Sequence, residues 1–134
     1  MATLTIRIDF ENCSAFGPGK ARLLELIDSE GSIRRAAAAM DMSYRQAWLL
    51  LRDAEAVIGA PLIVTATGGA KGGGTRLSDA GSMVIARFRS IEQNAALAAR
   101  NDLHALERIA VAGATTRRGT GASGTSRRRA KTTS

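Results

Sequence analysis

The sequence is poor in the residues that form disulfides, metal sites and catalytic clusters. Its 134 residues include one cysteine and one histidine, His104, and only 4% are aromatic. One cysteine cannot form an intramolecular disulfide, and no spacing of metal ligands is present. An enzyme needs a base, a nucleophile or a metal cluster, and no such combination can be named. We therefore expect no enzymatic activity, no cofactor and no metal.

Long apolar runs are also missing. No stretch approaches the roughly 18 to 20 apolar residues that cross a bilayer, and the N-terminus has no basic region followed by an apolar stretch. We expect a soluble cytoplasmic protein with no membrane partner. Hydrophobic residues make up 45% of the chain, which is enough for one modest core built mainly of Leu, Ile, Val and Ala.

Acidic residues are absent from the C-terminal part. Residues 1–107 hold all 12 Asp and Glu with 12 of the 19 Lys and Arg, so the whole net charge of +7 lies in residues 108–134. This segment is rich in Gly, Ser, Thr and Ala and can bury too little surface to offset chain entropy. We predict a folded domain at 1–107 and a disordered basic tail at 108–134. The tail suits sequence-independent contact with phosphates, and a solvated, dispensable end is the alternative.

Residues 31–52 predict two short helices joined by a tight turn. Ser32 suits the N-cap of the first helix, and Asp41 tolerates the left-handed backbone conformation of a turn. Ser43 and Gln46 then form the S-x-x-Q capping box of the second helix. This is the layout of a DNA-binding helix-turn-helix, with an ordinary helical hairpin as the alternative.

The two predicted helices are apolar where they face each other and cationic outside. Small or apolar side chains fall at inward spacing: Ala36, Ala37, Met40, Met42, Ala47 and Leu50. At about 100° per residue, the outer face of the second helix shows Arg45, Trp48, Leu49 and Arg52, without an acid. An exposed face with one sign of charge favours a nucleic-acid partner.

The flanking segments predict the rest of a small domain. Residues 3–10 alternate apolar and polar side chains, which predicts a strand. Residues 18–29 predict a helix that ends near Gly31 and turns its apolar side to the core. The predicted core residues of this helix are Ala21, Leu24, Leu26 and Ile27.

A glycine-rich β-hairpin, or wing, is predicted after the second helix ends near Gly59. Residues 61–67 and 75–77 have strand character, and the turn between them contains Gly69, Gly72, Gly73 and Lys71. Glycines allow close approach to phosphates, and Lys71 and Arg76 supply charge. A nucleotide-phosphate loop is excluded because its lysine follows the glycines at the start of a helix. A flexible hairpin without a ligand is the alternative.

A long helix is predicted from Ser78, its N-cap, to about Leu106. Apolar residues recur along it at three- and four-residue steps, which predicts a dimer seam. The predicted seam residues are Val84, Phe88, Ile91, Ala95 and Ala98. Packing of this helix back on its own domain is the alternative.

Three groups of residues together carry a resemblance to a known family. They are Gly31-Ser32-Ile33 with Ala36-Ala37, Met42-Ser43-Tyr44-Arg45 with Ala47-Trp48, and Thr67-Gly68-Gly69 with Lys71-Gly72-Gly73-Gly74 and Leu77. Over about residues 4–100 the chain resembles the N-terminal winged domain of ModE-type molybdate-responsive regulators, and more distantly LysR-type DNA-binding domains. The resemblance implies a homodimeric regulator of molybdenum-related genes that inserts the helix from Ser43 to Arg52 into the major groove. Full-length members continue into oxyanion-binding domains, so we expect a form without its own molybdate-binding domain, with any effector or partner protein separate.

The expected fold is mainly α with a small β part: a winged helix-turn-helix with an N-terminal strand, a β-hairpin wing and a long C-terminal dimerisation helix. Its expected partners are double-stranded DNA and a second copy, and it would be nucleoid-associated when bound. The predicted DNA-binding residues are Ser32, Arg34, Ser43, Tyr44, Arg45, Gln46, Trp48, Arg52, Gly69, Lys71, Gly72, Gly73 and Arg76. Trp48 can touch DNA or brace the wing. An architectural nucleoid-type protein of low sequence specificity is the alternative function.

Overall fold

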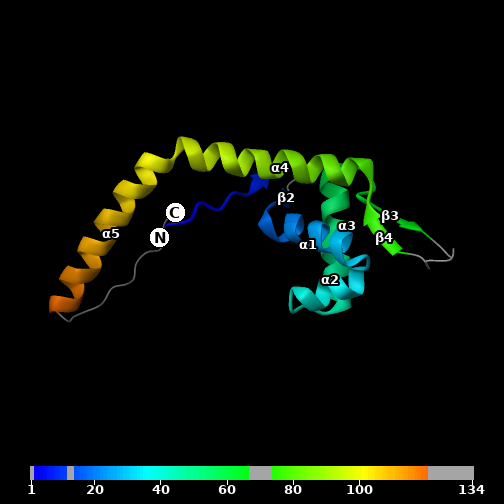
Figure 1. Cartoon of the computed structure of the whole chain (residues 1–134), viewed down its shortest axis with the longest axis horizontal. Helices are drawn as coiled ribbons and strands as arrows, with labels where there is room; N and C mark the ends of the chain where they lie inside the picture. The colour runs from blue at the N-terminus through cyan, green and yellow to red at the C-terminus, as the bar shows by residue number, and fades with distance from the viewer. Residues whose placement is uncertain (1, 12–13, 67–73, 121–134) are drawn as a thin grey trace. The chain divides into compact units, whose positions relative to one another are not determined.

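The computed structural model describes residues 2–11, 14–66 and 74–120, which form five helices and two short antiparallel hairpins. By contacts the chain divides into two units: Thr5–Asn94, and Met1–Leu4 with Ala95–Ser134. Figure 1 labels the elements. They are β1 (Ile8–Asp9), β2 (Ala15–Phe16), α1 (Pro18–Glu30), α2 (Ile33–Ala39), α3 (Tyr44–Ile58), β3 (Ile63–Ala66), β4 (Gly74–Leu77), α4 (Asp79–Ala98) and α5 (Arg100–Thr120). The predicted fold class, mainly helical with a winged helix-turn-helix, is confirmed.

The turns of the helix-turn-helix lie where the sequence predicts them. Gly31 ends α1 with φ 78°, and Gly59 ends α3 with φ 86°, a left-handed conformation that glycine adopts without strain. Asp41 has φ 56° in the turn between α2 and α3. Ser32 caps α2 by accepting a hydrogen bond from the backbone N–H of Arg35 at 2.9 Å.

The core of the first unit lies where α1, α2 and α3 meet and where Phe88 of α4 packs against Phe16 of β2. Their ring centroids are 5.3 Å apart in an edge-to-face arrangement. The buried side chains are Phe16, Ala21, Leu23, Leu24, Ile27, Ala36, Ala37, Ala47, Leu51, Ala54, Val57, Leu62 and Phe88. Leu26, predicted for the core, is only half-buried, and Leu23 is buried in its place.

Phe88 corrects one part of the sequence-based dimer seam. Its side chain is 2% exposed in its own chain, so it is not available to a second copy. The three- and four-residue repeat placed Phe88 on the apolar side of the predicted helix. It could not show that Phe16, from a distant part of the sequence, covers the ring of Phe88.

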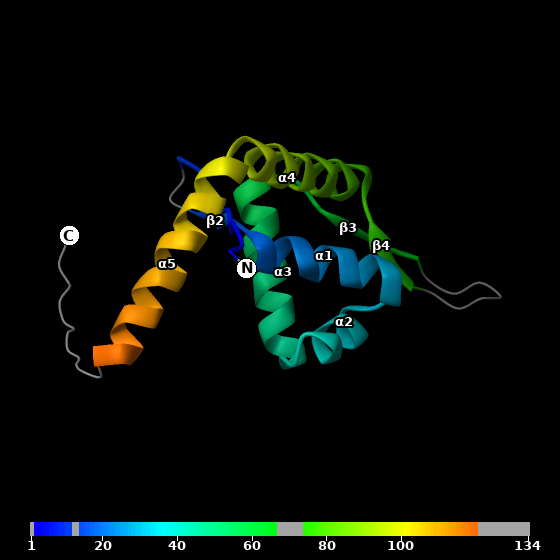
Figure 2. The same cartoon turned by 60° about the vertical axis from the view of Figure 1, so that its left-hand side comes forward.

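The base of the wing is bonded to the helix-turn-helix. β3 pairs antiparallel with β4, with Val64 opposite Arg76. The backbone N–H of Thr75 donates to the carbonyl of Gly31 at 2.9 Å, and the N–H of Leu77 donates to the Asp28 carboxylate at 3.0 Å. Figure 2 shows the hairpin leaving the domain beside the C-terminal end of α1.

α4 starts close against Pro61 and Leu62, the two residues that precede β3. The Ser78 hydroxyl caps α4 by accepting from the N–H of Gly81 at 3.0 Å, and it donates to the carbonyl of Pro61 at 2.8 Å. Gly81 is buried, and a Cβ there would lie 2.2 Å from the carbonyl oxygen of Leu62. Only glycine therefore permits this approach of α4 to the backbone at Leu62.

An ion pair links α1 to α4. Arg89 is bonded to Glu25 and to Glu92, each at 2.6 Å. The hydrogen bond to Glu25, followed by the one to Glu92, raises the pKa of Arg89. The hydrogen bond from Arg89 in turn lowers the pKa of Glu25. Both groups are thus held in their charged forms.

The N-terminal strand is shorter than its alternating sequence predicts. Residues 3–10 have the strand pattern, but only Ile8–Asp9 pairs, because its partner Ala15–Phe16 is two residues long. A strand needs a partner for its backbone N–H and C=O groups. The pattern therefore identified Ile6 and Ile8 as partly buried side chains, whereas Leu4 and Phe10 are exposed and no full strand forms.

The prediction of a single long helix from Ser78 to Leu106 is wrong, because α4 and α5 occupy this segment. The helix is interrupted at Ala99, although the N–H groups of Ala99 and Leu103 still donate to carbonyls four residues back. No residue here explains the interruption.

α5 continues to Thr120, so residues 108–120, predicted as disordered tail, are helical. Residues 109–112 (IAVA) contain two alanines, which favour this continuation. Residues 121–134 of the predicted tail lie outside the described residues.

Two further features concern the second unit. The backbone N–H of Ala2 donates to the Glu107 carboxylate, and His104 is exposed. None of the helices that the structure describes is both long and apolar enough to span a membrane.

We predict that Gly81→Ala destabilises the first unit by about 1–3 kcal/mol, because the added Cβ must displace the backbone at Leu62. Urea unfolding followed by circular dichroism measures the change. The control is Gly19→Ala in α1, where a Cβ meets nothing within 4 Å and helix propensity favours alanine. Equal stability of the two variants would contradict the close approach at Gly81.

Candidate DNA interface

The N-terminus of α3 is fixed by the predicted capping box. The Ser43 hydroxyl accepts from the N–H of Gln46, and the N–H of Ser43 donates to the side-chain oxygen of Gln46, both at 3.0 Å. Two otherwise unpaired backbone N–H groups are thereby satisfied. Ser43 and Gln46, both predicted DNA-binding residues, are exposed, but their facing oxygens are used to hold the helix start.

α3 has one buried side and one exposed side. Ala47, Leu51, Ala54 and Val57 are buried against the core. The opposite side shows Arg45, Trp48, Leu49 and Arg52, as the sequence predicts, with Trp48 41% and Leu49 47% exposed. A helix held from behind by small residues thus presents cationic and apolar groups outward.

Two arginines of the predicted set lie over aromatic rings. The guanidinium carbon of Arg34, on α2, is 4.9 Å from the centroid of Tyr44 at the start of α3. The guanidinium carbon of Arg52 is 5.1 Å from the centroid of Trp48, one turn earlier on α3. Both distances are within the range of cation–π attraction. Sequence reasoning named all four residues but not these pairs.

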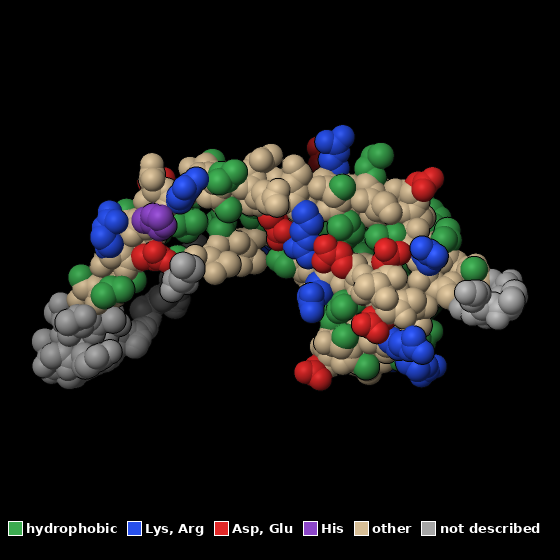
Figure 3. Space-filling view, viewed as in Figure 1, with side chains coloured by type: hydrophobic (Ala, Val, Ile, Leu, Met, Phe, Trp, Pro, Cys, Tyr) green, Lys and Arg blue, Asp and Glu red, His purple; other side chains and the backbone are tan. Residues whose placement is uncertain are grey.

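α2 brings further positive charge to the same region. Arg34 and Arg35 are both exposed. On the face seen in Figure 3, Lys and Arg side chains lie among Asp and Glu side chains over the helix-turn-helix part of the domain. Ser32, predicted to bind DNA, has its hydroxyl engaged as the cap of α2. Its direct role in DNA binding stays a prediction.

The wing is described only at its base. Arg76 on β4 is exposed, and Val64, its partner on β3, is 52% exposed. The predicted wing residues Gly69, Lys71, Gly72 and Gly73 lie outside the described residues. Val64 is absent from the predicted contacts, and the sequence of residues 63–66 (IVTA) has no alternation that would indicate its outward position.

Exposed arginines beside aromatic rings suit one kind of partner. Guanidinium groups bind phosphates and guanine edges with paired hydrogen bonds, and an α-helix fits the major groove of B-DNA. The elements that carry these arginines, two helices joined by a tight turn and followed by a hairpin, have the arrangement of a winged helix-turn-helix.

Comparison with known families agrees with this geometry. Residues 19–82, which include α1, α2, α3 and both wing strands, match the family described as "Bacterial regulatory helix-turn-helix protein, lysR family". This segment is a LysR-type helix-turn-helix domain. The exposed side of α3 therefore lies within the segment that matches this family.

Curated relatives resemble the same N-terminal region. The "Molybdenum transport protein ModE" of Azotobacter vinelandii is 39% identical over 85 residues, which are 63% of this chain and 32% of that protein. The protein of the same name from Herbaspirillum seropedicae is 44% identical over 71 residues, 53% of this chain and 26% of that protein. The "Transcriptional regulator ModE" of Haemophilus influenzae is 30% identical over 90 residues, 67% and 35% respectively. The matched part is between 26% and 35% of each relative's length.

Proposed function

We propose that this protein is a transcriptional regulator that binds an inverted-repeat operator as a homodimer and controls molybdenum-related genes. The exposed cationic side of the capped helix α3 carries the proposal. The helix-turn-helix family supports DNA binding, and the names of the relatives support regulation linked to molybdenum.

In the proposed complex, α3 enters the major groove with its N-terminal half toward the bases. Arg45 lies on this half, exposed, and can bond guanine through two N–H groups. Arg76, at the base of the wing, contacts the neighbouring sugar-phosphate backbone. The capping box keeps the start of α3 in a fixed conformation, so the position of Arg45 relative to the groove is set by the fold.

We predict that Arg45→Ala weakens operator binding by about 1–3 kcal/mol and changes binding to random DNA little, because a base contact is lost. The operator is first selected by the wild-type protein from random duplexes, and affinities are measured by fluorescence anisotropy. Arg22→Ala is the control, because Arg22 is an exposed arginine on α1 close enough to Glu25 to lower its pKa. Equal losses on both DNAs would make Arg45 a phosphate contact.

An architectural, nucleoid-type role is the second candidate, and the basic excess of residues 108–134 favours it. The two functions differ in the ratio of affinities for the selected site and for random DNA. A regulator gives a ratio of roughly 10³ or more, whereas an architectural protein gives a ratio near one. Genome-wide binding separates them in the cell, as discrete sites beside molybdenum-related genes or as uniform coverage.

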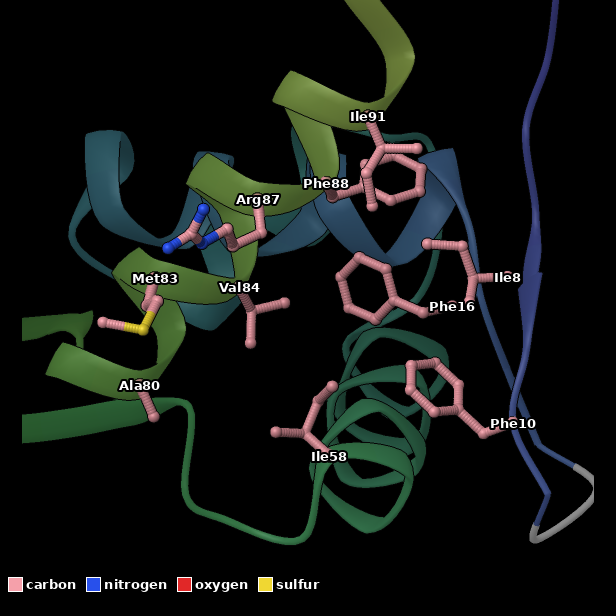
Figure 4. A pocket seen from close by; sticks show the side chains of 10 residues that line it. All are labelled: Ile8, Phe10, Phe16, Ile58, Ala80, Met83, Val84, Arg87, Phe88 and Ile91. Atoms are coloured by element: carbon pink, nitrogen blue, oxygen red, sulfur yellow. The ribbon is translucent and has the colours of Figure 1, made fainter. Parts of the chain in front are cut away.

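An uncovered apolar hollow on the first unit supports the proposed dimer. Its volume is about 350 Å³, and side chains from α4, from the N-terminal hairpin and from the end of α3 surround it (Figure 4). The lining residues are Ile8, Phe10, Phe16, Ile58, Ala80, Met83, Val84, Arg87, Phe88 and Ile91. Met83 is 62% exposed and Ile91 is 42% exposed.

We propose that a second copy covers this hollow through α4, with Val84 and Ile91 in the contact. Phe88 forms part of the floor and is not a contact residue. Ala95 and Ala98, the other predicted seam residues, belong to the second unit, where Leu97, Leu106, Ile109 and Val111 are also exposed apolar residues. A symmetric dimer would place two α3 helices about 34 to 36 Å apart, one turn of DNA, or a multiple of this distance.

We predict that Ile91→Glu converts the dimer to monomer at micromolar concentration, because a buried interface does not tolerate an unpaired carboxylate. Sedimentation velocity measures the change. Gln93→Glu is the matched control, because Gln93 is exposed on α4 and is about 200° around the helix from Ile91. A wild-type protein that sediments as a monomer would remove the basis of the dimer.

We also propose that the basic C-terminal segment contacts phosphates without reading sequence. Truncation after Thr120 spares α5 and removes Arg127, Arg128, Arg129 and Lys131. Affinity for every DNA should fall, and each lost phosphate contact should reduce the slope of log affinity against log salt by about 0.9. The measurement is a salt titration with selected and random duplexes. Loss of sequence preference at an unchanged slope would instead assign base reading to this segment.

A further inference from the structure

Two of the five aromatic residues of the chain, Tyr44 and Trp48, lie on α3. The sequence contains one tyrosine and one tryptophan, and both are on the exposed side of α3, with Tyr44 45% and Trp48 41% exposed. Of the three phenylalanines, Phe16 and Phe88 are buried in the core and Phe10 is 37% exposed. Tyr44 and Trp48 therefore expose much of their ring surface on the side of α3 assigned to DNA.

Each of these two rings carries an arginine. Arg34 reaches across from α2 to Tyr44 at 4.9 Å, and Arg52 lies over Trp48 at 5.1 Å. Tyr44, Trp48 and Arg52 are spaced four residues apart, so they form one row along α3. Within the described residues, these two are the cation–π pairs of the helix-turn-helix, and both involve arginines that the sequence assigns to DNA binding.

A guanidinium that stacks on a ring keeps its hydrogen-bonding capacity. The ring covers the face of the planar group, whereas the N–H donors point outward in the plane of the group. The stack also restricts a long side chain that would otherwise lose rotamer freedom on binding. An arginine held in this way can meet a phosphate with less entropy to lose.

We propose that Tyr44 and Trp48 are positioning residues, which hold Arg34 and Arg52 in the orientation in which these arginines bind DNA phosphates. Arg34 reaches this row from α2, and Arg52 belongs to the row itself, so both guanidinium groups would lie beside the groove floor. Arg45 and Leu49, in the neighbouring row, then face the base edges. This assignment rests on the DNA binding proposed above.

A double-mutant cycle tests the pair Trp48 and Arg52. Trp48→Leu should weaken binding to selected and random duplexes alike, by about two- to five-fold, which is the size of an exposed cation–π contact. In the Arg52→Ala background the same substitution should cause no further loss, because the arginine that Trp48 positions is gone. Trp48→Phe, which keeps a ring, should retain most of the affinity. Additive losses would overturn the proposal and make Trp48 a direct DNA contact.

A control cycle separates positioning from general damage. Trp48→Leu combined with Arg76→Ala should give additive losses, because Arg76 is on β4, whereas the ring of Trp48 carries Arg52. Non-additivity here as well would mean that Trp48→Leu disturbs the whole interface, which would also overturn the proposal. The pair Tyr44 and Arg34 is tested in the same way, with Tyr44→Leu, Arg34→Ala and the conservative Tyr44→Phe.

The single tryptophan provides a second readout that needs no DNA. Trp48 is the sole source of tryptophan fluorescence, so acrylamide quenching reports on what covers its ring. Quenching should increase in Arg52→Ala and stay unchanged in Arg45→Ala, since only Arg52 lies over the ring. Equal quenching of wild type and Arg52→Ala would overturn the stack. If the wild-type protein shows no preference for any selected site, the proposal of sequence-specific regulation is wrong. The double-mutant cycle of Trp48 and Arg52 on random DNA still tests the positioning role in that case.

Discussion

The close packing of alanines beneath α3 is the constraint on which the interface depends. Ala36 and Ala37 of α2, Ala21 of α1 and Ala47 of α3 are at most 2% exposed. A side chain of one methyl group lets two helix axes approach closely, and a larger one would push α3 outward, because protein interiors have little free volume. The exposed arginines of α3 are therefore positioned from behind, by residues that have no contact with DNA.

Ion pairing divides the charges of the first unit into two groups. Arg89 is neutralised by Glu25 and Glu92, and Lys20 pairs with Asp53 at 2.6 Å. These pairs join α1 to α4 and α1 to α3, and they serve the fold. The arginines of the helix-turn-helix face, by contrast, lie over aromatic rings or at the surface. Their positive charge remains available to a polyanion although residues 1–107 are balanced in formal charge.

Local rules predicted the parts of the site that local physics determines. The capping box, the left-handed Asp41 and the terminal glycines depend on neighbouring residues, and the sequence placed all of them. The environment of Phe88 depends on Phe16, 72 positions away, and helical periodicity cannot reveal which surface covers an apolar stripe. The arginine stacks are a similar case, since Arg34 meets Tyr44 only after α2 and α3 have packed. The helix after residue 107 was not predicted because residues 108–134, taken together, are rich in Gly, Ser and Thr and contain few large apolar residues.

The hydrogen bonds of Gly31 and Asp28 to β4 have a mechanical meaning. The Gly31 carbonyl accepts a hydrogen bond from the N–H of Thr75, and the Asp28 carboxylate accepts one from the N–H of Leu77. The base of the hairpin is therefore fixed in orientation relative to α1. In the proposed complex, this would keep the major-groove contacts of α3 and the contacts of the wing at a constant distance from each other. Duplexes whose helical twist or groove width matches this distance would bind without distortion, while others would have to be overwound or unwound at an energetic cost. The proposed regulator would thereby discriminate between base pairs that it does not contact.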